Sequence, residues 1–342
     1  MKKLITLISI VFAIVATFVA CHDSEDMITP SGNYSPIRGG FPQGNSKYDT
    51  IINNIKDEYG VYLLYKDITE TDLNRNWLST GTGDIYIAGP EEERNAPAWN
   101  LPEEQLPYYV DYFRNEIFSN ISREFAKSAF PVKMYMIDNL RTEPRDFGED
   151  SGNSSSGGTN IDPRKLLMKG NFDCWAISFS DEMMNSDEAS YALKQQRCML
   201  IIELIKNIDS KNELGSPDEF WTGFNFKDTM DIKNPSAANY KYKLGFVDMI
   251  NDNFGTGRQK QVWVEYYFTS TEYWEKSNPN YNLFTTYIKN IMWLTPEEFE
   301  ERYPIADYPM IHEKRDIAIN YMKEKHGIDL IRISYGNSKE QK

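Results

Sequence analysis

The chain of 342 residues contains only three histidines, His22, His312 and His326. Histidine is the commonest protein ligand of metals, and a catalytic zinc site takes about three protein ligands plus a water. His22 lies near the start of the chain, whereas His312 and His326 lie close to its end. We therefore expect His312 and His326 to be polar surface side chains rather than metal ligands.

Cysteine is equally scarce, since Cys21, Cys174 and Cys198 are the full set. Cys21 lies at the end of the apolar N-terminal segment discussed below, so Cys174 and Cys198 are the two cysteines of the folded part. In an oxidising compartment these two could form a disulfide. Cys198 lies in an apolar stretch, so a buried free thiol is the alternative.

Basic side chains are outnumbered: 37 Lys+Arg stand against 51 Asp+Glu, and the formal net charge is −14. An acidic surface disfavours nucleic acid and anionic membranes as partners. Aromatic residues make up 14% of the chain, and this abundance argues against disorder and for a packed globular core. The alternative is that some of these aromatic rings lie at the surface and stack on sugars.

The start of the chain is typical of a bacterial targeting segment. Met1-Lys2-Lys3 is basic, residues 4–20 are mostly apolar, and Phe18-Val19-Ala20-Cys21 resembles a lipobox. We predict a lipoprotein signal peptide at 1–20 and lipidation of Cys21, whose acyl chains would anchor the protein in a membrane. An ordinary cleaved signal peptide is the alternative. A transmembrane helix is disfavoured because the apolar run is short.

Residues 21–44 are rich in Ser, Gly, Pro and Asn and predict a flexible tether. The acidic residues in 22–26 resemble the surface-export signals of Bacteroidota lipoproteins, and a solvated acidic tether is the alternative reading. The expected location is the outer membrane, lipid-anchored at the cell surface or on the periplasmic face.

The next part of the chain predicts a mixture of helices and short strands. Helical spacing begins at Lys47 and ends at Gly60, and the composition of 61–65 and 132–137 is typical of strands. A long amphipathic helix begins at 102–104. Its apolar face is formed by Tyr109, Phe113, Ile117, Ile121 and Phe125.

Two short apolar segments, 166–168 and 174–179, predict a hairpin, and the polar stretch before them, 143–160, predicts a loop within the domain. A Gly/Pro/Asn-rich excursion covers 209–245. The C-terminal part is then predicted to be mostly helical. Its elements are helices at 258–270, 281–292, 296–302 and 308–325 and an extended piece at 328–333.

The apolar stretch from Cys198 to Ile208 predicts a buried helix with one acidic residue, Glu203, at its centre. Zinc peptidases carry H-E-x-x-H on such a helix, because histidines at i and i+4 share a face and the glutamate handles the proton of the metal-bound water. Here Ile202 and Lys206 stand at the two histidine positions. An alkyl chain does not bind zinc, and an ammonium repels it.

Glu203 needs a partner if it is buried, because an unpaired carboxylate in an apolar environment is costly. Lys206 lies one turn away on the same side of the helix. We expect the two to form an ion pair, with the ammonium near the place of the metal. The alternative is that Lys206 extends to solvent and Glu203 faces an open cleft.

Several segments resemble the zinc metallohydrolase lipoproteins of Bacteroidota, a metallopeptidase-like family encoded beside TonB-dependent glycan and nutrient importers. The resemblance runs from about 45 to 334. It implies a single α+β domain of zincin type over 45–334, with a small mixed sheet, a long active-site-type helix and a mostly helical C-terminal part, followed by a tail at 335–342. The segments that carry it are Tyr48-Asp49, Leu63-Leu64-Tyr65, Gly245-Phe246-Val247, Asn320-Tyr321-Met322-Lys323 and Gly327-Ile328-Asp329-Leu330.

In active relatives the central helix resembles H-H-E-F-A-H-I-L, which maps onto residues 201–208. The resemblance implies that Glu203 is a vestigial general base and that Ile202, Lys206 and Glu265 occupy the ligand positions. Zinc is the cofactor of active relatives. For this chain we expect no cofactor and no metal, because two of the three ligands are missing.

The leading functional hypothesis is therefore a degenerate member of this family. It would be a non-catalytic binding or accessory protein of an outer-membrane uptake system, taking a peptide, a glycan or the importer as partner and binding no nucleic acid. The alternative is an active zinc metallohydrolase or peptidase with a non-standard metal site. A third hypothesis is a structural subunit of the uptake complex in which the cleft has no role.

Overall fold

The computed structural model describes residues 37, 39–74, 85–89, 99–143, 167–168, 173–179, 184, 189–226, 230–251, 262–264 and 283–336. The chain divides into two compact units, Met1–Phe41 and Pro42–Lys342, of which the second contains every helix and strand discussed below. The predicted signal peptide, with Cys21 and most of the tether, lies outside the described residues, as do the tail from 337 and nearly all of the predicted loop at 143–160.

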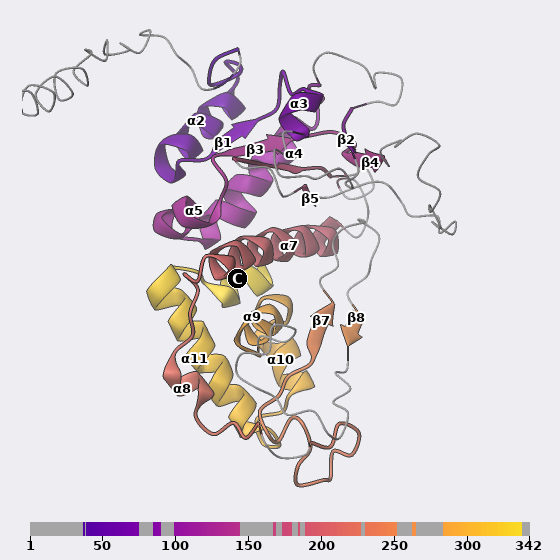
Figure 1. Cartoon of the computed structure of the whole chain (residues 1–342), viewed down its shortest axis with the longest axis vertical. Helices are drawn as coiled ribbons and strands as arrows, with labels where there is room; N and C mark the ends of the chain where they lie inside the picture. Colours follow the sequence, from indigo (N-terminus) through magenta and orange to yellow (C-terminus); the bar gives the residue numbers. More distant parts are fainter. Residues whose placement is uncertain are drawn as a thin grey trace, which may run out of the picture. The chain divides into compact units, whose positions relative to one another are not determined.

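A four-stranded sheet with the order β1-β3-β6-β5 forms the centre of the N-terminal part (Figure 1). Strands β1 (Tyr62–Leu64), β3 (Lys133–Met136) and β6 (Cys174–Ile177) are parallel, and β5 (Leu167–Met168) pairs with β6 in the antiparallel direction. These strands confirm the predicted strands and the predicted hairpin. All four residues of β6 are buried, as is expected of an inner strand of such a sheet.

Helix α2 (Lys47–Tyr59) begins and ends where its sequence predicts. Ser46 accepts hydrogen bonds from the backbone N–H groups of Tyr48 and Asp49, and the Asp49 carboxylate accepts one from Ser46 N at 2.8 Å. This reciprocal capping box satisfies two otherwise unpaired donors. At the other end Gly60 has φ 77°, a left-handed conformation that glycine adopts without strain.

The predicted single helix from residue 102 is wrong, because the segment is interrupted twice. It consists of α4 (Leu106–Asp111), a π-helical turn η2 (Tyr112–Ile117), a 3₁₀ turn η3 (Phe118–Asn120) and α5 (Arg123–Ala129). The backbone is extended at Ile121 and Ser122, and Ser122 then caps α5 by accepting from Phe125 N. The predicted apolar face is nevertheless buried throughout. Its residues Tyr109, Phe113, Ile117, Ile121 and Phe125 are at most 6% exposed.

Helix α7 (Ala189–Ser210) contacts both parts of the second unit. It packs against η2 and α5 on the side of the sheet and against α9 and α12 of the C-terminal helices (Figure 1). Its central residues are apolar on nearly every side, a pattern typical of a fully buried helix. The residues from Cys198 to Ile202, together with Leu204, Ile205 and Ile208, are at most 1% exposed.

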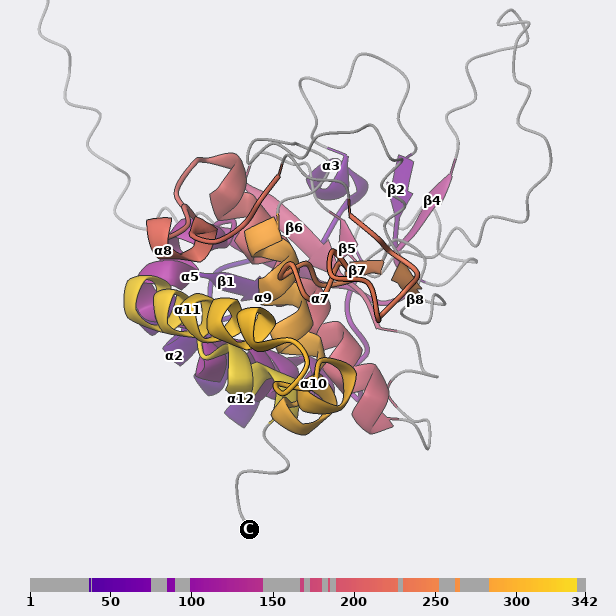
Figure 2. The same ribbon diagram turned by 90° about the horizontal axis from the view of Figure 1, so that it is seen from below.

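The C-terminal part contains α8 (Asp218–Trp221), the two-stranded sheet β7 (Met249–Asn251) and β8 (Val262–Val264), and helices α9 (Leu283–Trp293), α10 (Pro296–Arg302), α11 (Pro309–His326) and α12 (Leu330–Tyr335). Helices α9, α11 and α12 pack against one another, as the view from below shows (Figure 2). No helix within the described ranges is both long and apolar enough to cross a membrane.

Two C-terminal predictions are wrong. The segment predicted as a helix at 258–270 contains β8, in which Val262 and Val264 are β-branched residues whose strand preference is met by pairing with β7. The segment predicted as extended at 328–333 includes α12, whose N-cap Asp329 accepts a hydrogen bond from Arg332 N at 3.0 Å. The predicted helices at 281–292, 296–302 and 308–325 are confirmed by α9, α10 and α11.

Cys174 and Cys198 are both buried free thiols, so the disulfide alternative is not realised. The expectation that the C-terminal histidines lie at the surface is wrong. His312 is 8% exposed, and its Nε2 lies 2.5 Å from the carbonyl oxygen of Tyr303. His326 is half-buried, and burial lowers the pKa of its imidazole.

A buried ion pair connects α7 with the π-helical turn. The Arg197 guanidinium bonds the Glu116 carboxylate, with side chains only 3% and 9% exposed, and Arg197 Nε also donates to the Ile333 carbonyl at 2.7 Å. One side chain therefore holds α7, η2 and α12 together.

We predict that Glu116→Gln lowers the free energy of unfolding by about 3 kcal/mol, because it leaves a buried guanidinium without its counter-charge. Urea unfolding followed by circular dichroism measures this value. The matched control is Glu58→Gln, which breaks the exposed Arg123–Glu58 pair and should have no measurable effect. Equal, small effects of both changes would show that the buried pair contributes little.

Candidate functional site

Glu203 and Lys206 form the ion pair predicted from their spacing on α7. Lys206 Nζ lies 2.8 Å from Glu203 Oε1, and the side chains are 38% and 12% exposed, respectively. The Lys206 side chain is therefore partly exposed to solvent, while its ammonium neutralises the less exposed carboxylate. Of the two alternatives considered for Lys206, contact with Glu203 is the one that the structure contains.

The neighbouring positions on α7 are occupied by packing and by backbone contacts. Ile202 is 1% exposed and belongs to the core. Asn207, next to Lys206, donates from Nδ2 to the Ala129 carbonyl at 2.7 Å and so joins α7 to the end of α5. The paired Glu203 carboxylate thus lies between the buried Ile202 and Asn207, which bonds the backbone of α5.

The donor set on this helix does not fit zinc. A zinc ion needs nitrogen, sulfur or carboxylate donors, whereas Ile202 offers an alkyl group, and Glu203 is the one donor among the three motif positions. Its carboxylate already interacts with an ammonium, which would repel a second cation. Within the described parts of the chain, no group of three or more His, Cys, Asp or Glu side chains is arranged to hold a metal ion.

The other predicted site residues are not described. Glu265, predicted from the resemblance to occupy the third ligand position, directly follows β8 but lies outside the described residues, as does Cys21. The structure therefore brings Ile202, Glu203 and Lys206 together on one helix and does not place Glu265 relative to them.

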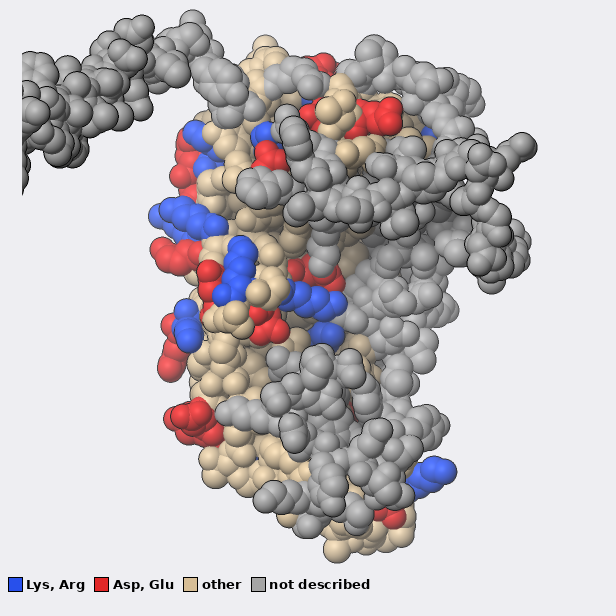
Figure 3. Space-filling model, in the orientation of Figure 1, with Lys and Arg blue, Asp and Glu red and all other residues tan. Residues whose placement is uncertain are grey.

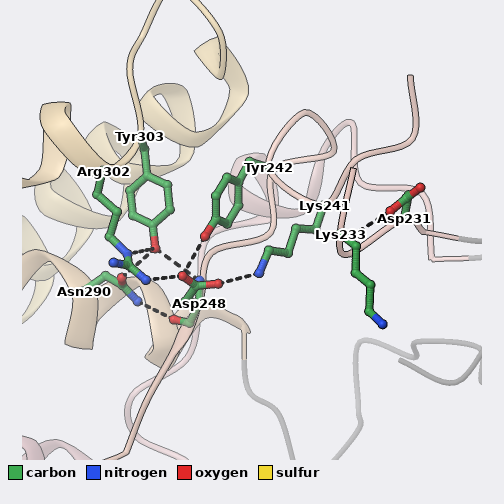
Figure 4. A network of polar contacts seen from close by, with 8 residues as sticks. All are labelled: Asp231, Lys233, Lys241, Tyr242, Asp248, Asn290, Arg302 and Tyr303. Carbon is green, nitrogen blue, oxygen red and sulfur yellow. Dashed lines mark hydrogen bonds and ion pairs between the residues drawn. The ribbon is translucent and has the colours of Figure 1, made fainter. Parts of the chain in front are cut away.

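A second polar cluster, centred on Asp248, was not anticipated from the sequence (Figure 4). The Asp248 side chain is 2% exposed, and its carboxylate accepts from Lys241 Nζ at 2.8 Å, from the Tyr242 hydroxyl at 2.6 Å and from the Arg302 guanidinium. Lys241 is itself only 4% exposed. Asp248 follows Gly245-Phe246-Val247 directly, and an acidic residue between apolar pairs was the signal that could have indicated a buried carboxylate.

The backbone of Asp248 is held as firmly as its side chain. Its N–H donates to the Tyr303 hydroxyl at 3.2 Å, and its carbonyl accepts from Asn290 Nδ2 at 2.9 Å. The Tyr303 hydroxyl in turn donates to Asn290 Oδ1 at 3.1 Å. The cluster therefore joins the segment before β7 to α9 and α10, and its bonded groups fit a structural role rather than a reactive one.

Electrostatics in the Asp248 cluster favour the ionised acid. Burial by itself raises the pKa of the Asp248 carboxyl, but the hydrogen bonds from Lys241 and Tyr242 and the charges of Lys241 and Arg302 outweigh it and lower this pKa. Burial and the nearby carboxylate raise the pKa of Tyr242, so its hydroxyl stays protonated and donates.

The face drawn in Figure 3 shows no gathering of described charges of one sign. Where the described residues are visible in Figure 3, Lys and Arg side chains lie next to Asp and Glu side chains. On that face the charges of both signs are interspersed, so the net charge of −14 is not gathered there into one acidic surface.

Comparisons with known proteins give little beyond the geometry. No protein-family model and no curated protein matches the chain. Among solved structures it is similar to a Bacteroides caccae protein provisionally named a zinc-binding metallo-peptidase, with 11% identity and a TM-score of 0.39 over 85% of this chain and 92% of that one. Neither value is high enough to establish a shared activity.

We predict that Asp248→Asn lowers the free energy of unfolding at pH 7 by about 3 kcal/mol, because it removes the carboxylate charge that pairs with the buried Lys241 ammonium. The folded pKa of Asp248 lies below the ordinary value of about 3.9, so its stabilisation is present above pH ~4 and is lost as the pH falls below that. We therefore expect the difference in the free energy of unfolding between wild type and variant, measured by urea unfolding, to become smaller from pH 7 to pH 3. A difference that stays constant with pH would contradict this account.

Proposed function

We propose that this chain is a lipid-anchored, non-catalytic binding protein of an outer-membrane nutrient-uptake system, built on a zinc-peptidase-like frame that has lost its metal chemistry. The observation that carries the proposal is the chemistry of three residues of α7, Ile202, Glu203 and Lys206. Ile202 is 1% exposed, and Lys206 lies 2.8 Å from Glu203, the residue at the position of the general base.

The chemistry of these three residues supports binding rather than hydrolysis. A metallopeptidase activates water with a metal and removes its proton with a free carboxylate. At this site an ammonium holds the carboxylate, and an ammonium offers neither a Lewis acid of comparable strength nor an open coordination position. The pair therefore conserves the charge balance of the helix without supplying the reaction.

The anchoring part of the proposal depends on the N-terminal sequence. Phe18-Val19-Ala20-Cys21 would place acyl chains on Cys21, and the residues after it would serve as a tether to the folded unit. A peptide or a glycan is the proposed ligand, with a TonB-dependent importer as the proposed partner. An active hydrolase with a non-standard metal site is the competing function, and no described donor cluster favours it.

The metal part of the proposal is tested by elemental analysis of the full chain, purified in detergent and dialysed after incubation with zinc. We expect no stoichiometric zinc in the natural sequence. The double variant Ile202→His plus Lys206→His should bind about one zinc per chain, because histidines at i and i+4 beside Glu203 restore the ligand face.

The matched control is Ile201→His plus Lys206→His, which introduces the same side chains on different faces of α7 and should not retain zinc. Stoichiometric zinc in the natural sequence would favour the competing hydrolase. No zinc in the Ile202/Lys206 double variant would contradict the resemblance of α7 to a zinc helix.

The anchoring part is tested separately with Cys21→Ser. The natural chain should incorporate radiolabelled palmitate and sediment with the outer membrane, whereas the variant should carry no label and appear in the soluble fraction. Cys174→Ser is the control and should keep both properties, since that thiol is buried in the folded unit. Unchanged labelling of Cys21→Ser would disprove the anchor.

A further inference from the structure

Arg141 differs from the other buried basic side chains in the described part of the chain. Four Lys or Arg residues are buried there, and Arg141 is one of them, with 5% of its surface exposed. The other three each have a carboxylate partner: Arg197 with Glu116, Lys241 with Asp248 and Lys314 with Glu313. A buried charge without a counter-charge is costly, so the position of Arg141 needs an explanation.

The Arg141 guanidinium bonds backbone carbonyls through one of its three nitrogens. Nη1 donates to the Gly89 carbonyl at 2.8 Å and lies 3.5 Å from the Asn139 carbonyl oxygen. Among the described residues, no Asp or Glu side chain forms an ion pair with Arg141. The acidic residue nearest in sequence, Asp138, has its Oδ1 3.4 Å from Gln105 Nε2. Carbonyl oxygens accept hydrogen bonds from the guanidinium but do not neutralise its charge.

The other two nitrogens of Arg141, Nε and Nη2, are the donors that remain. They have no partner among the described residues, yet they are absent from the fully buried side-chain atoms that lack one. Both nitrogens therefore reach solvent, although the rest of the side chain is buried. Nε–H and Nη2–H point the same way along one edge of the planar group, and this edge matches the two oxygens of a carboxylate.

Arg141 lies beyond the carboxyl end of a parallel strand. It is the first residue of β4 (Arg141–Glu143), which begins shortly after β3 ends at Met136 and pairs in the antiparallel direction with β2 (Ile85–Ile87) (Figure 1). Ligands of proteins with parallel strands commonly bind beyond this end of the sheet.

Backbone hydrogen bonds fix the turn that carries the guanidinium. The Gly89 carbonyl also accepts from Asn139 Nδ2 at 3.3 Å, and Gly89 N donates to the Asp138 carbonyl at 3.0 Å. Leu140 N donates to the Ser178 hydroxyl oxygen at 3.2 Å and so ties the turn to the end of β6. The donors are therefore held in place before a ligand binds, which lowers the entropy cost of binding.

We propose that Arg141 binds a ligand carboxylate, which accepts two parallel hydrogen bonds from Nε and Nη2. The ligand supplies the counter-charge that the other buried basic side chains receive from the protein. The net charge of −14 disfavours unspecific attraction of anions, so selectivity comes from the planar guanidinium edge. The site does not include Glu203 or Lys206, and it stands whether or not α7 binds zinc.

A carboxylate occurs at the C-terminus of a peptide and in uronic acids, so two pairs of probes distinguish the source. N-acetyl-alanyl-alanine is compared with its C-terminal amide, and glucuronic acid with glucose, by saturation-transfer NMR on the full chain in detergent. We expect transfer to at least one acid and not to its neutral partner, and the acid that responds identifies the source. Transfer to neither acid, or equal transfer within both pairs, overturns the proposal.

Arg141→Lys separates the planar edge from the charge. Lysine keeps a positive charge and a donor for the Gly89 carbonyl but has no second coplanar donor, so we expect the responding acid to bind about tenfold more weakly. The matched control is Arg123→Lys, which changes an exposed arginine paired with Glu58 and should bind like wild type.

Circular dichroism verifies that both variants fold. Unchanged affinity in a folded Arg141→Lys overturns the proposal. If this variant does not fold, the comparison of each acid with its neutral partner on the natural chain still decides the result.

Discussion

The contact between Arg197 and Glu116 is the interaction on which the arrangement of the helices depends. A charged pair that is 3% and 9% exposed is stable because each charge has its partner, and Arg197 gains a further acceptor in the Ile333 carbonyl. Since Arg197 lies on α7, Glu116 on η2 and Ile333 on α12, this pair sets the position of the central helix against both parts of the unit. Glu116 lies within the π-helical turn η2, so this irregular turn carries the acidic partner of the pair.

The place of Glu203 follows from the burial of α7. The central residues around Glu203 are apolar and buried. An acidic residue is tolerated among them where its side chain is near solvent and in contact with a cation. Glu203 meets both conditions through Lys206. The Lys206 side chain is 38% exposed, and its ammonium contacts the Glu203 carboxylate. This side of α7 therefore presents a carboxylate and an ammonium whose charges cancel.

The polar groups of this protein fall into two contrasting classes. The Asp248 cluster satisfies its buried groups through Lys241, Tyr242, Arg302, Asn290 and Tyr303 and therefore behaves as an internal brace for the C-terminal helices. Elsewhere in the described part of the chain, buried atoms that have no hydrogen-bond partner include Trp99 Nε1, Gln105 Oε1 and Gln196 Nε2.

The sequence alone determined the local structure that depends on neighbouring residues. Ser46 and Gly60 set the ends of α2, the apolar composition of short segments placed β1, β3 and β6, and the i to i+3 spacing predicted the Glu203–Lys206 pair. The tertiary structure decided what depends on distant residues. It broke the predicted helix after residue 102 around the Glu116–Arg197 contact, made β8 a strand by pairing it with β7, and brought Lys241 and Arg302 to Asp248. Helix caps and helical periodicity depend on residues a few positions apart, so the sequence predicts them. The partner of a buried charge can come from any part of the chain that packing brings within hydrogen-bond distance, so only the tertiary structure shows it.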